Sequence, residues 1–396
     1  PDALPQSHIQ IELSRSIAGS LIEGLDYLTG FPYGCVEQTM SRALPNAVVS
    51  RAFFQLGIGS RDPKLPAKVN ASLQKLYGFQ HNDGGWGWWY DDATDAYQTA
   101  WVLFGLAQIQ EAGYEVETAV LERGADWLNE NMLSLDPRTR AYALYSIAVA
   151  NQANLEATLK AYDNDLDKLD TFGRASLALA LHKAGEREKA EQVLDLLVET
   201  AVTLENGHIY WQGAIQDGIY TSKTMASDTR NTALALSAFA QIRPNSGLEA
   251  SIVRWLMAQR KAQGWGTTNE TSFAILGLTD HLLATTSAAA GETGYTVLLN
   301  GSAVFAGTLG QGEPSVSLEI PFDKLQVGAN GVKVVSENGR LYATLNYHLY
   351  EAKSEIDAAG FVKIERTYLD PETNRPLTTI EPSQLVRVRL AVTLPN

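Results

Sequence analysis

Three stretches of the chain repeat one order of features, and this repeat restricts the possible folds more than any other part of the sequence. Each stretch has a loop with Gly and Trp, then a polar cluster, then a helix that starts near a Thr and continues with Ala and Leu; these are residues 83–106, 210–239 and 263–278. Helix pairs that repeat about every 40–60 residues stack into a solenoid or close into a ring, because one helical hairpin cannot bury its own apolar face. We therefore expect a closed, all-α α/α toroid with Ala-rich and Thr-rich helices inside.

Hydrophobic periodicity divides the chain into three parts. Up to about residue 288 apolar residues recur with the helical period, and caps such as Asp136 before Pro137 fall where helices need them. From residue 289 to about 355 the period is two, and Asn300-Gly301 and Asn338-Gly339 each predict a hairpin in an antiparallel β domain. Residues 356–396 predict two more strands, which are marginal alone in water. We expect a multidomain fragment of a longer protein.

Charge and composition exclude several classes of protein. The 396 residues carry 31 Lys and Arg against 45 Asp and Glu, and the resulting net charge of −14 repels nucleic acid and anionic lipid headgroups. No run of about 18 apolar residues occurs, so we expect no membrane-spanning helix. The six His residues are scattered, and the single Cys has no His at ligand spacing. We therefore expect no metal and no other cofactor.

The single cysteine, Cys35, lies in the segment FPYGCVEQTMSR, residues 31–42. It starts a helical segment, whose positive end lowers a thiol pKa. Gln38 lies three residues later on the same face, so the thiolate can attack its carboxamide carbon, expel ammonia and leave an internal thioester in a ring of about 15 atoms. Storage of this bond needs a dry pocket, and the candidates to line it are Phe31, Tyr33 and Met40. The alternative is a binding module in which Cys35 is a plain buried thiol.

The segment YGCVEQTMSR, the GGWGWW loop and the β-rich tail together resemble the C-terminal part of the α-2-macroglobulin and complement family, above all its bacterial members. The resemblance implies that residues 1–288 are a thioester domain, whose first residues are a linker or a CUB-like strand. Residues 289–355 would be the C-terminal part of a CUB-like β domain. Residues 356–396 would begin a terminal macroglobulin-like β-sandwich, truncated in this chain.

The resemblance also assigns individual residues. Those that match the family's motif are Cys35 and Gln38 as the thioester pair, with Gly34, Glu37 and Tyr33 around them. Phe31 departs from the pattern, because bacterial members often have a shielding Tyr at this place. Complement proteins that prefer hydroxyl targets use a His as acyl carrier, and His208 is the nearest candidate by order along the chain. The alternative is that His208 is only a packed loop residue. Without an acyl-carrier His, we expect the targets to be protein lysines.

The function that the resemblance implies is a broad-spectrum protease trap with endopeptidase inhibitor activity. A protease cuts a bait region outside this chain, the thioester is exposed, and Gln38 becomes amide-linked to a lysine of the protease while Cys35 is freed. The trap is used once, so we expect no enzyme. The implied partners are target proteases, the other domains of the parent chain and a periplasmic cell-wall synthase. The implied role is bacterial defence, in the periplasm or at the cell surface, by a lipoprotein whose anchor lies N-terminal to this chain.

A second function comes from a different class. Asp91, Asp92 and Asp95 could be the acid cluster of a toroidal enzyme, similar to a terpene cyclase or a glycosidase, in which one carboxyl donates a proton and another stabilises a cation or activates water. Their structural reading is that they cap the helix that follows and form the turn before it.

Overall fold

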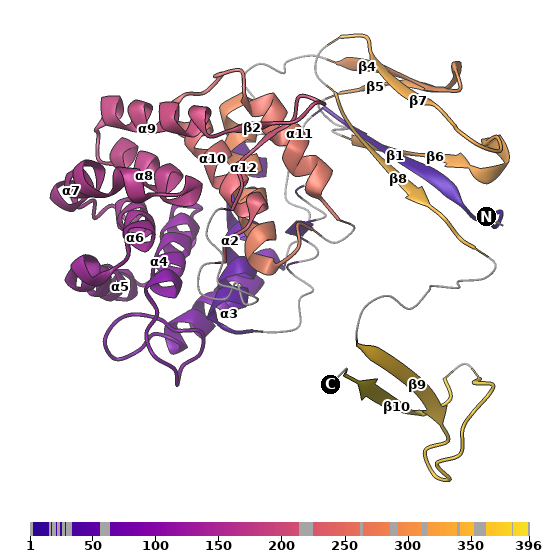
Figure 1. Ribbon diagram of the computed structural model, residues 1–396, viewed down its shortest axis with the longest axis horizontal. Helices are drawn as coiled ribbons and strands as arrows, with labels where there is room; N and C mark the ends of the chain where they lie inside the picture. Colours follow the sequence, from indigo (N-terminus) through magenta and orange to yellow (C-terminus); the bar gives the residue numbers. More distant parts are fainter. Residues whose placement is uncertain are drawn as a thin grey trace. The chain divides into compact units, whose positions relative to one another are not determined.

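The computed structural model describes residues 3–15, 17, 21, 24–25, 28, 34–55, 64–213, 225–261, 264–285, 292–310, 315–338, 341–351, 362–381 and 383–394. The chain combines helices with several antiparallel sheets, as expected (Figure 1). It divides into two compact units: residues 11–318 with 326–345, and residues 1–10 with 319–325 and 346–396. The three-domain division expected from the sequence stays a prediction.

The helices all belong to the larger unit up to Thr285. They are α2 (Val36–Gln55), α3 (Leu65–Gly78), α4 (Ala96–Glu111), α5 (Thr118–Asn131), α6 (Pro137–Val149), α7 (Leu155–Asp165), α8 (Thr171–Lys183), α9 (Arg187–Glu199), α10 (Asp228–Ile242), α11 (Glu249–Gln259) and α12 (Thr268–Thr285), with short 3₁₀ turns at Met132–Ser134 and Leu166–Lys168. The expected cap is present: the Asp136 carboxylate accepts hydrogen bonds from the first turn of α6, and Pro137 starts the helix. Among the described residues, no helix has the length and apolar character needed to cross a membrane.

Six of the described helices pack as a closed ring of neighbours. α2 packs against α4, α4 against α6, α6 against α8, α8 against α10, α10 against α12, and α12 against α2. Intervening helices pack on these, α3 on α2, α5 on α4, α9 on α8 and α11 on α10, and Figure 1 shows α4, α6, α8 and α10 side by side. The ring helices approach closely, since a Cβ at Gly277 of α12 would collide with the Ala233 carbonyl of α10. Each pair of helices therefore buries its apolar surface only against its neighbours, as repeating helical units require.

Each of the three Gly/Trp loops is held in place by the same two kinds of hydrogen bond. In each loop the Trp backbone N–H donates to a Thr hydroxyl near the start of the next ring helix, and the indole N–H donates to a carbonyl of the preceding helix. The backbone bonds join Trp86 to Thr99 at 2.9 Å, Trp211 to Thr232 at 3.0 Å and Trp265 to Thr271 at 2.9 Å. The indole bonds reach Leu76, Leu197 and Leu256. All three indoles are buried. The repeated Gly/Trp sequence therefore forms the same connection between successive helices three times.

In the part of the chain that the structure describes, the strands form four small sheets. β4 (Thr293–Leu299) pairs antiparallel with β5 (Ser302–Leu309) and β7 (Val332–Ser336). β1 (His8–Ser14), β6 (Ser315–Pro321) and β8 (Tyr342–His348) form a sheet in the order β6-β1-β8, with a 3₁₀ turn at Phe322–Lys324 after β6. β9 (Lys363–Leu369) pairs antiparallel with β10 (Arg387–Thr393), and β2 (Val202–Thr203) with β3 (Ile209–Tyr210).

One of the two predicted hairpins is present, and the prediction of the other is wrong. Asn300 and Gly301 both have positive φ, at 50° and 85°, which is the conformation that a tight hairpin turn between β4 and β5 requires. Around Asn338 the flanking strands join different sheets, β7 beside β4 and β8 beside β1. The Asn338 side chain instead accepts a hydrogen bond from the Gly294 backbone N–H at 3.0 Å, so it fixes the start of β4.

Candidate functional site

Cys35 lies immediately before the first residue of α2, with 5% of its surface exposed. Burial raises the pKa of the Cys35 thiol, while hydrogen bonds from the backbone N–H groups of Gln38 and Glu37 act in the opposite direction. The sequence predicted a lowered pKa from the helix start alone, and this prediction is wrong, because the desolvation of the sulfur outweighs the helix N-terminus. The thiol is therefore protonated at neutral pH.

The side chain of Gln38 folds back onto Cys35 across one turn of α2. The Cys35 backbone N–H donates to Gln38 Oε1 at 3.3 Å. This is half of a capping box, in which the third residue of a helix binds the backbone of the residue that precedes the helix. The spacing of three residues predicted that the two side chains share one face. The hydrogen bond agrees with this, and it gives the carboxamide carbonyl a backbone N–H partner.

Glu37 joins this first turn to α12, the neighbouring helix of the ring. Its side chain is 3% exposed, and it accepts hydrogen bonds from the hydroxyl of Ser41 and, at 2.8 Å, from the hydroxyl of Thr268 at the start of α12. Burial raises the pKa of the Glu37 carboxyl, and the two hydroxyl donors lower it in part. The charge of Glu37 also raises the pKa of Cys35. Glu37 therefore acts on the site by positioning and by charge.

The first Gly/Trp loop reaches the start of α2. The Val36 backbone N–H, which no residue within the helix can pair with, donates to the Trp88 carbonyl at 3.0 Å. Asp92 holds the tip of this loop by accepting from the backbone N–H groups of Trp88 at 2.8 Å and Trp89 at 3.2 Å. The Trp89 side chain is 52% exposed. The loop thus extends the wall of the site to the surface.

The other predicted residues of the motif have different places. A Cβ at Gly34 would collide with the ammonium group of Lys75 from α3, so this glycine leaves room for a cation directly beside the first turn of α2. Met40 is fully buried, and it packs where a Cβ on Gly105 of α4 would lie. Phe31 and Tyr33 lie outside the described residues. The shielding role of these aromatic residues and of Met40 stays a prediction.

Two side chains, one in the loop that reaches this turn and one on α3, were not identified as candidates in the sequence. His81 shares the first Gly/Trp loop, and its Nε2 lies 3.0 Å from the Trp89 carbonyl oxygen. Lys75 lies 40 residues after Cys35, on another helix. His208 lies elsewhere: it belongs to the turn between β2 and β3 and contacts Asn206 of the same turn. The only signal for His81 was its position before the GGWGWW loop.

Two of the three carboxylates of the alternative enzyme, Asp92 and Asp95, have local backbone partners. Asp95 caps α4 by accepting from the Gln98 backbone N–H at 2.8 Å, and burial raises the pKa of Asp95. Asp92 binds the loop backbone as described above. Within the described residues, no group of three or more His, Cys, Asp or Glu side chains is placed to hold a metal ion. The geometry therefore favours the structural reading of Asp92 and Asp95.

Comparison with known proteins gives one family. Residues 9–134 and 141–281 match the family model described as "A-macroglobulin TED domain". Among curated relatives, the α-2-macroglobulin of Thermotoga maritima is 28% identical over 269 residues, which are 68% of this chain and 15% of the relative. That of Escherichia coli K12 is 25% identical over 284 residues, or 67% of this chain and 16% of the relative. The chain thus spans about a sixth of the length of these relatives.

Solved structures give the same fold. Native E. coli α-2-macroglobulin, from domain MG7 to the C-terminus, has a TM-score of 0.69 at 20% identity. The match covers 100% of this chain and 61% of that structure. Salmonella α-2-macroglobulin reacted with methylamine has a TM-score of 0.67 at 21% identity, with coverages of 99% and 25%. E. coli α-2-macroglobulin activated by porcine elastase has a TM-score of 0.54 at 21% identity, with coverages of 100% and 35%.

Proposed function

Because the chain belongs to the A-macroglobulin TED domain family, we propose that it is the thioester-bearing part of a bacterial protease trap, in which Cys35 and Gln38 form the reactive bond. The observation that carries this proposal is the hydrogen bond from the Cys35 N–H to Gln38 Oε1, with the sulfur on the same turn. We assign the ring of helices as the α/α toroid of the thioester domain. The sheets around β4 and β1 are assigned to a CUB-like domain, and β9 with β10 to the start of a macroglobulin-like domain.

Formation of the bond uses only groups of this turn. The Cys35 sulfur attacks the carboxamide carbon of Gln38, the carbon–nitrogen bond breaks, and ammonia leaves with the thiol proton. Negative charge develops on Gln38 Oε1 in the tetrahedral intermediate, where the Cys35 backbone N–H already donates. The raised pKa of the Cys35 thiol makes the thiolate scarce, so we expect formation to be slow and to occur once.

Capture is the attack of an amine on the thioester, and it releases the Cys35 sulfur. A neutral lysine amine of the protease attacks the same carbon, the carbon–sulfur bond breaks, and the sulfur takes up the proton that the amine loses. The thiol is a much better leaving group than an amine, and the buried Cys35 returns to its protonated form, so the amide is not reversed. The site turns over nothing, and each chain inhibits one protease.

The remaining assignments rest on the family and on the resemblance. The elastase-activated E. coli relative supports proteases as the target class. We propose that the parent protein lies in the periplasm or at the cell surface, through a lipid anchor outside this chain. We keep a cell-wall synthase as a proposed partner on the resemblance alone. Neither nucleic acid nor a cofactor enters the mechanism.

Intact mass tests the thioester. Fresh protein should be about 17 Da lighter than its sequence mass, because ammonia has left, and methylamine should add about 31 Da while releasing one titratable thiol. Cys35→Ala and Gln38→Ala should each have the full sequence mass and ignore methylamine. A full mass together with a free thiol in fresh wild-type protein would contradict the proposal.

A further inference from the structure

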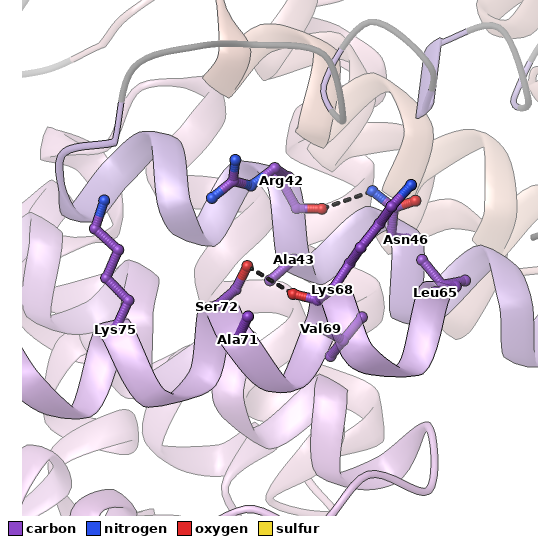
Figure 2. Close-up of a pocket in the computed structure, with 9 residues that line it drawn as sticks. All are labelled: Arg42, Ala43, Asn46, Leu65, Lys68, Val69, Ala71, Ser72 and Lys75. Carbon is purple, nitrogen blue, oxygen red and sulfur yellow. Dashed lines mark hydrogen bonds between the residues drawn. The ribbon is translucent and has the colours of Figure 1, made fainter. Parts of the chain in front are cut away.

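A pocket of about 380 Å³ lies between α2 and α3, on the side of α2 that continues from the reactive turn. Figure 2 shows its lining, which consists of Arg42, Ala43, Asn46, Leu65, Lys68, Val69, Ala71, Ser72 and Lys75. The floor is apolar, and the charged ends of the long side chains stand at its rim. Both helices belong to the same compact unit, so the pocket is part of the fold of that unit.

The charge of this pocket is opposite to that of the chain. Arg42, Lys68 and Lys75 line it, and none of its described lining residues carries a carboxylate, although the whole chain has a net charge of −14. Within the described part of the chain, neither Arg42 nor Lys75 forms an ion pair. The polar groups of Ser72 and Asn46 are directed to the helix backbone, with Ser72 Oγ donating to the Lys68 carbonyl at 3.1 Å and Asn46 Nδ2 to the Arg42 carbonyl at 2.7 Å.

The pocket lies one helical turn after Gln38 on α2, since its lining on that helix begins at Arg42. Gln38, Arg42 and Asn46 follow one another at intervals of four residues, so they share one face of α2, and Arg42 lies roughly 6 Å along the helix axis from Gln38. From the side of α3, the Lys75 ammonium group occupies the space beside Gly34, the residue before Cys35. In Figure 2 the Arg42 guanidinium group extends toward the side of the pocket where Lys75 stands.

We propose that this pocket binds a carboxylate of the captured protein, next to the lysine that attacks Gln38. The proposal deepens the thioester function and rests on it. An acidic target surface is repelled by most of this chain, and the Arg42 and Lys75 rim gives it a local partner, since a guanidinium group can bind a carboxylate through two parallel hydrogen bonds. The same two cations disfavour the protonated form of an approaching amine, so they increase its nucleophilic fraction. Lysines that have a carboxylate neighbour are therefore the preferred targets.

Paired small amines test this directly in the full 396-residue chain. 6-Aminohexanoate carries a carboxylate, and 6-aminohexanamide has the same shape without the charge. At low salt we expect the wild type to release its thiol roughly two- to fivefold faster with the acid than with the amide, the range that a partly exposed ion pair supplies. Sodium chloride at high concentration should bring the two rates together.

Substitutions test whether Arg42 and Lys75 cause the difference between the two rates. Arg42→Gln and Lys75→Gln should each lower the ratio of the two rates toward one, and because both probes react at the same carbon, general damage to the site cancels in the ratio. Lys160→Gln is the matched control, since it removes an exposed cation of α7 that pairs with Glu156, and it should keep the wild-type ratio. A ratio of one in wild-type protein, or a ratio that survives both substitutions, overturns the inference.

The outcome also separates this inference from the function on which it rests. If fresh protein shows no mass deficit and reacts with neither amine, the thioester proposal fails. The pocket is then tested by calorimetric titration with glutarate, which should bind the wild type and bind severalfold more weakly to Arg42→Gln. Absence of glutarate binding overturns the carboxylate site. A mass deficit with equal rates for both amines leaves the thioester in place and overturns only the role of the pocket.

Discussion

At the scale of single residues, burial decides the chemistry of the first turn of α2. Cys35 and Glu37 are both almost completely buried, and burial raises the pKa of each. A raised pKa keeps the Cys35 thiol in its protonated, weakly nucleophilic form. Glu37 in turn carries its charge in a site that is held by the hydroxyl groups of Ser41 and Thr268. The turn that carries Cys35 and Gln38 thus depends on Glu37, which ties it to α12 through Thr268.

Glu37→Gln should change how stability depends on pH. The folded-state pKa of Glu37 lies above the unfolded value, so its contribution to stability is fully present below the unfolded pKa and is lost as the pH rises through the folded pKa. The unfolding free energy of wild type minus that of Glu37→Gln should therefore fall as the pH rises above the unfolded pKa of about 4.3, by at most about 1.4 kcal/mol per pH unit. Urea unfolding of both proteins at each pH measures this difference.

Glu156 gives a control of opposite sign. It is exposed, and the hydrogen bond and charge of Lys160 lower its pKa, so its contribution is present above the unfolded pKa and is lost as the pH falls through the folded pKa. Glu156→Gln should therefore show a weak trend in the other direction. A pH-independent difference for Glu37→Gln would mean that its carboxyl keeps an ordinary pKa despite burial.

The sequence predicted part of this site. The spacing of Cys35 and Gln38 predicted a shared turn, and the hydrogen bond between them agrees; their role in a thioester stays a prediction. The pKa of the thiol was predicted in the wrong direction, because a local motif contains the helix start but not the depth of burial. The contact of Glu37 with Thr268 joins residues 231 positions apart. Such a contact, like that of Lys75 with Gly34, exists only once the helices have packed.

At the scale of elements, the repeated Trp and Thr residues join neighbouring helices of the ring. The sequence repeat predicted the loops and the helix starts, and the structure adds that the Thr hydroxyl is the acceptor for the Trp backbone N–H. The Asn338 turn shows the limit of such local signals. Its residues fit a hairpin, but the flanking strands pair with β4 and β1, which lie outside the local window.

Thr99→Val should cost more stability than Thr99→Ser. Thr99 is fully buried, and its hydroxyl accepts from the Trp86 backbone N–H at 2.9 Å and donates to the Asp95 carbonyl at 2.8 Å. Valine keeps the shape but leaves a buried donor unpaired, at about 1–3 kcal/mol, whereas serine keeps the hydroxyl and loses one methyl group, at about 0.8 kcal/mol. Urea unfolding followed by far-ultraviolet circular dichroism measures both. A larger loss for serine would show that packing of the methyl group matters more than the hydrogen bond.

At the scale of the whole molecule, the two compact units differ in how their elements are paired. The ring of helices contains most of the buried apolar side chains, and Tyr342, the first residue of β8, packs against that core. Among the described residues, β9 and β10 form a two-stranded sheet that no third strand joins, and the side chains of β10 are exposed along its whole length. Stability measured by loss of helix should therefore report on the ring and be independent of the β9–β10 pair.

A chain that ends at Glu351 tests this independence. It lacks β9 and β10 and keeps every strand of the other sheets, so the midpoint of thermal unfolding, followed at 222 nm, should stay within about 2 °C of that of the complete 396-residue chain, a change of less than about 1 kcal/mol. A chain that ends at Arg340 is the comparison, because it also removes β8 and the Tyr342 side chain that packs on the helical core, and its midpoint should fall by several degrees. A large fall in the first chain would mean that the β9–β10 segment stabilises the helices, and that the two parts fold as one cooperative unit.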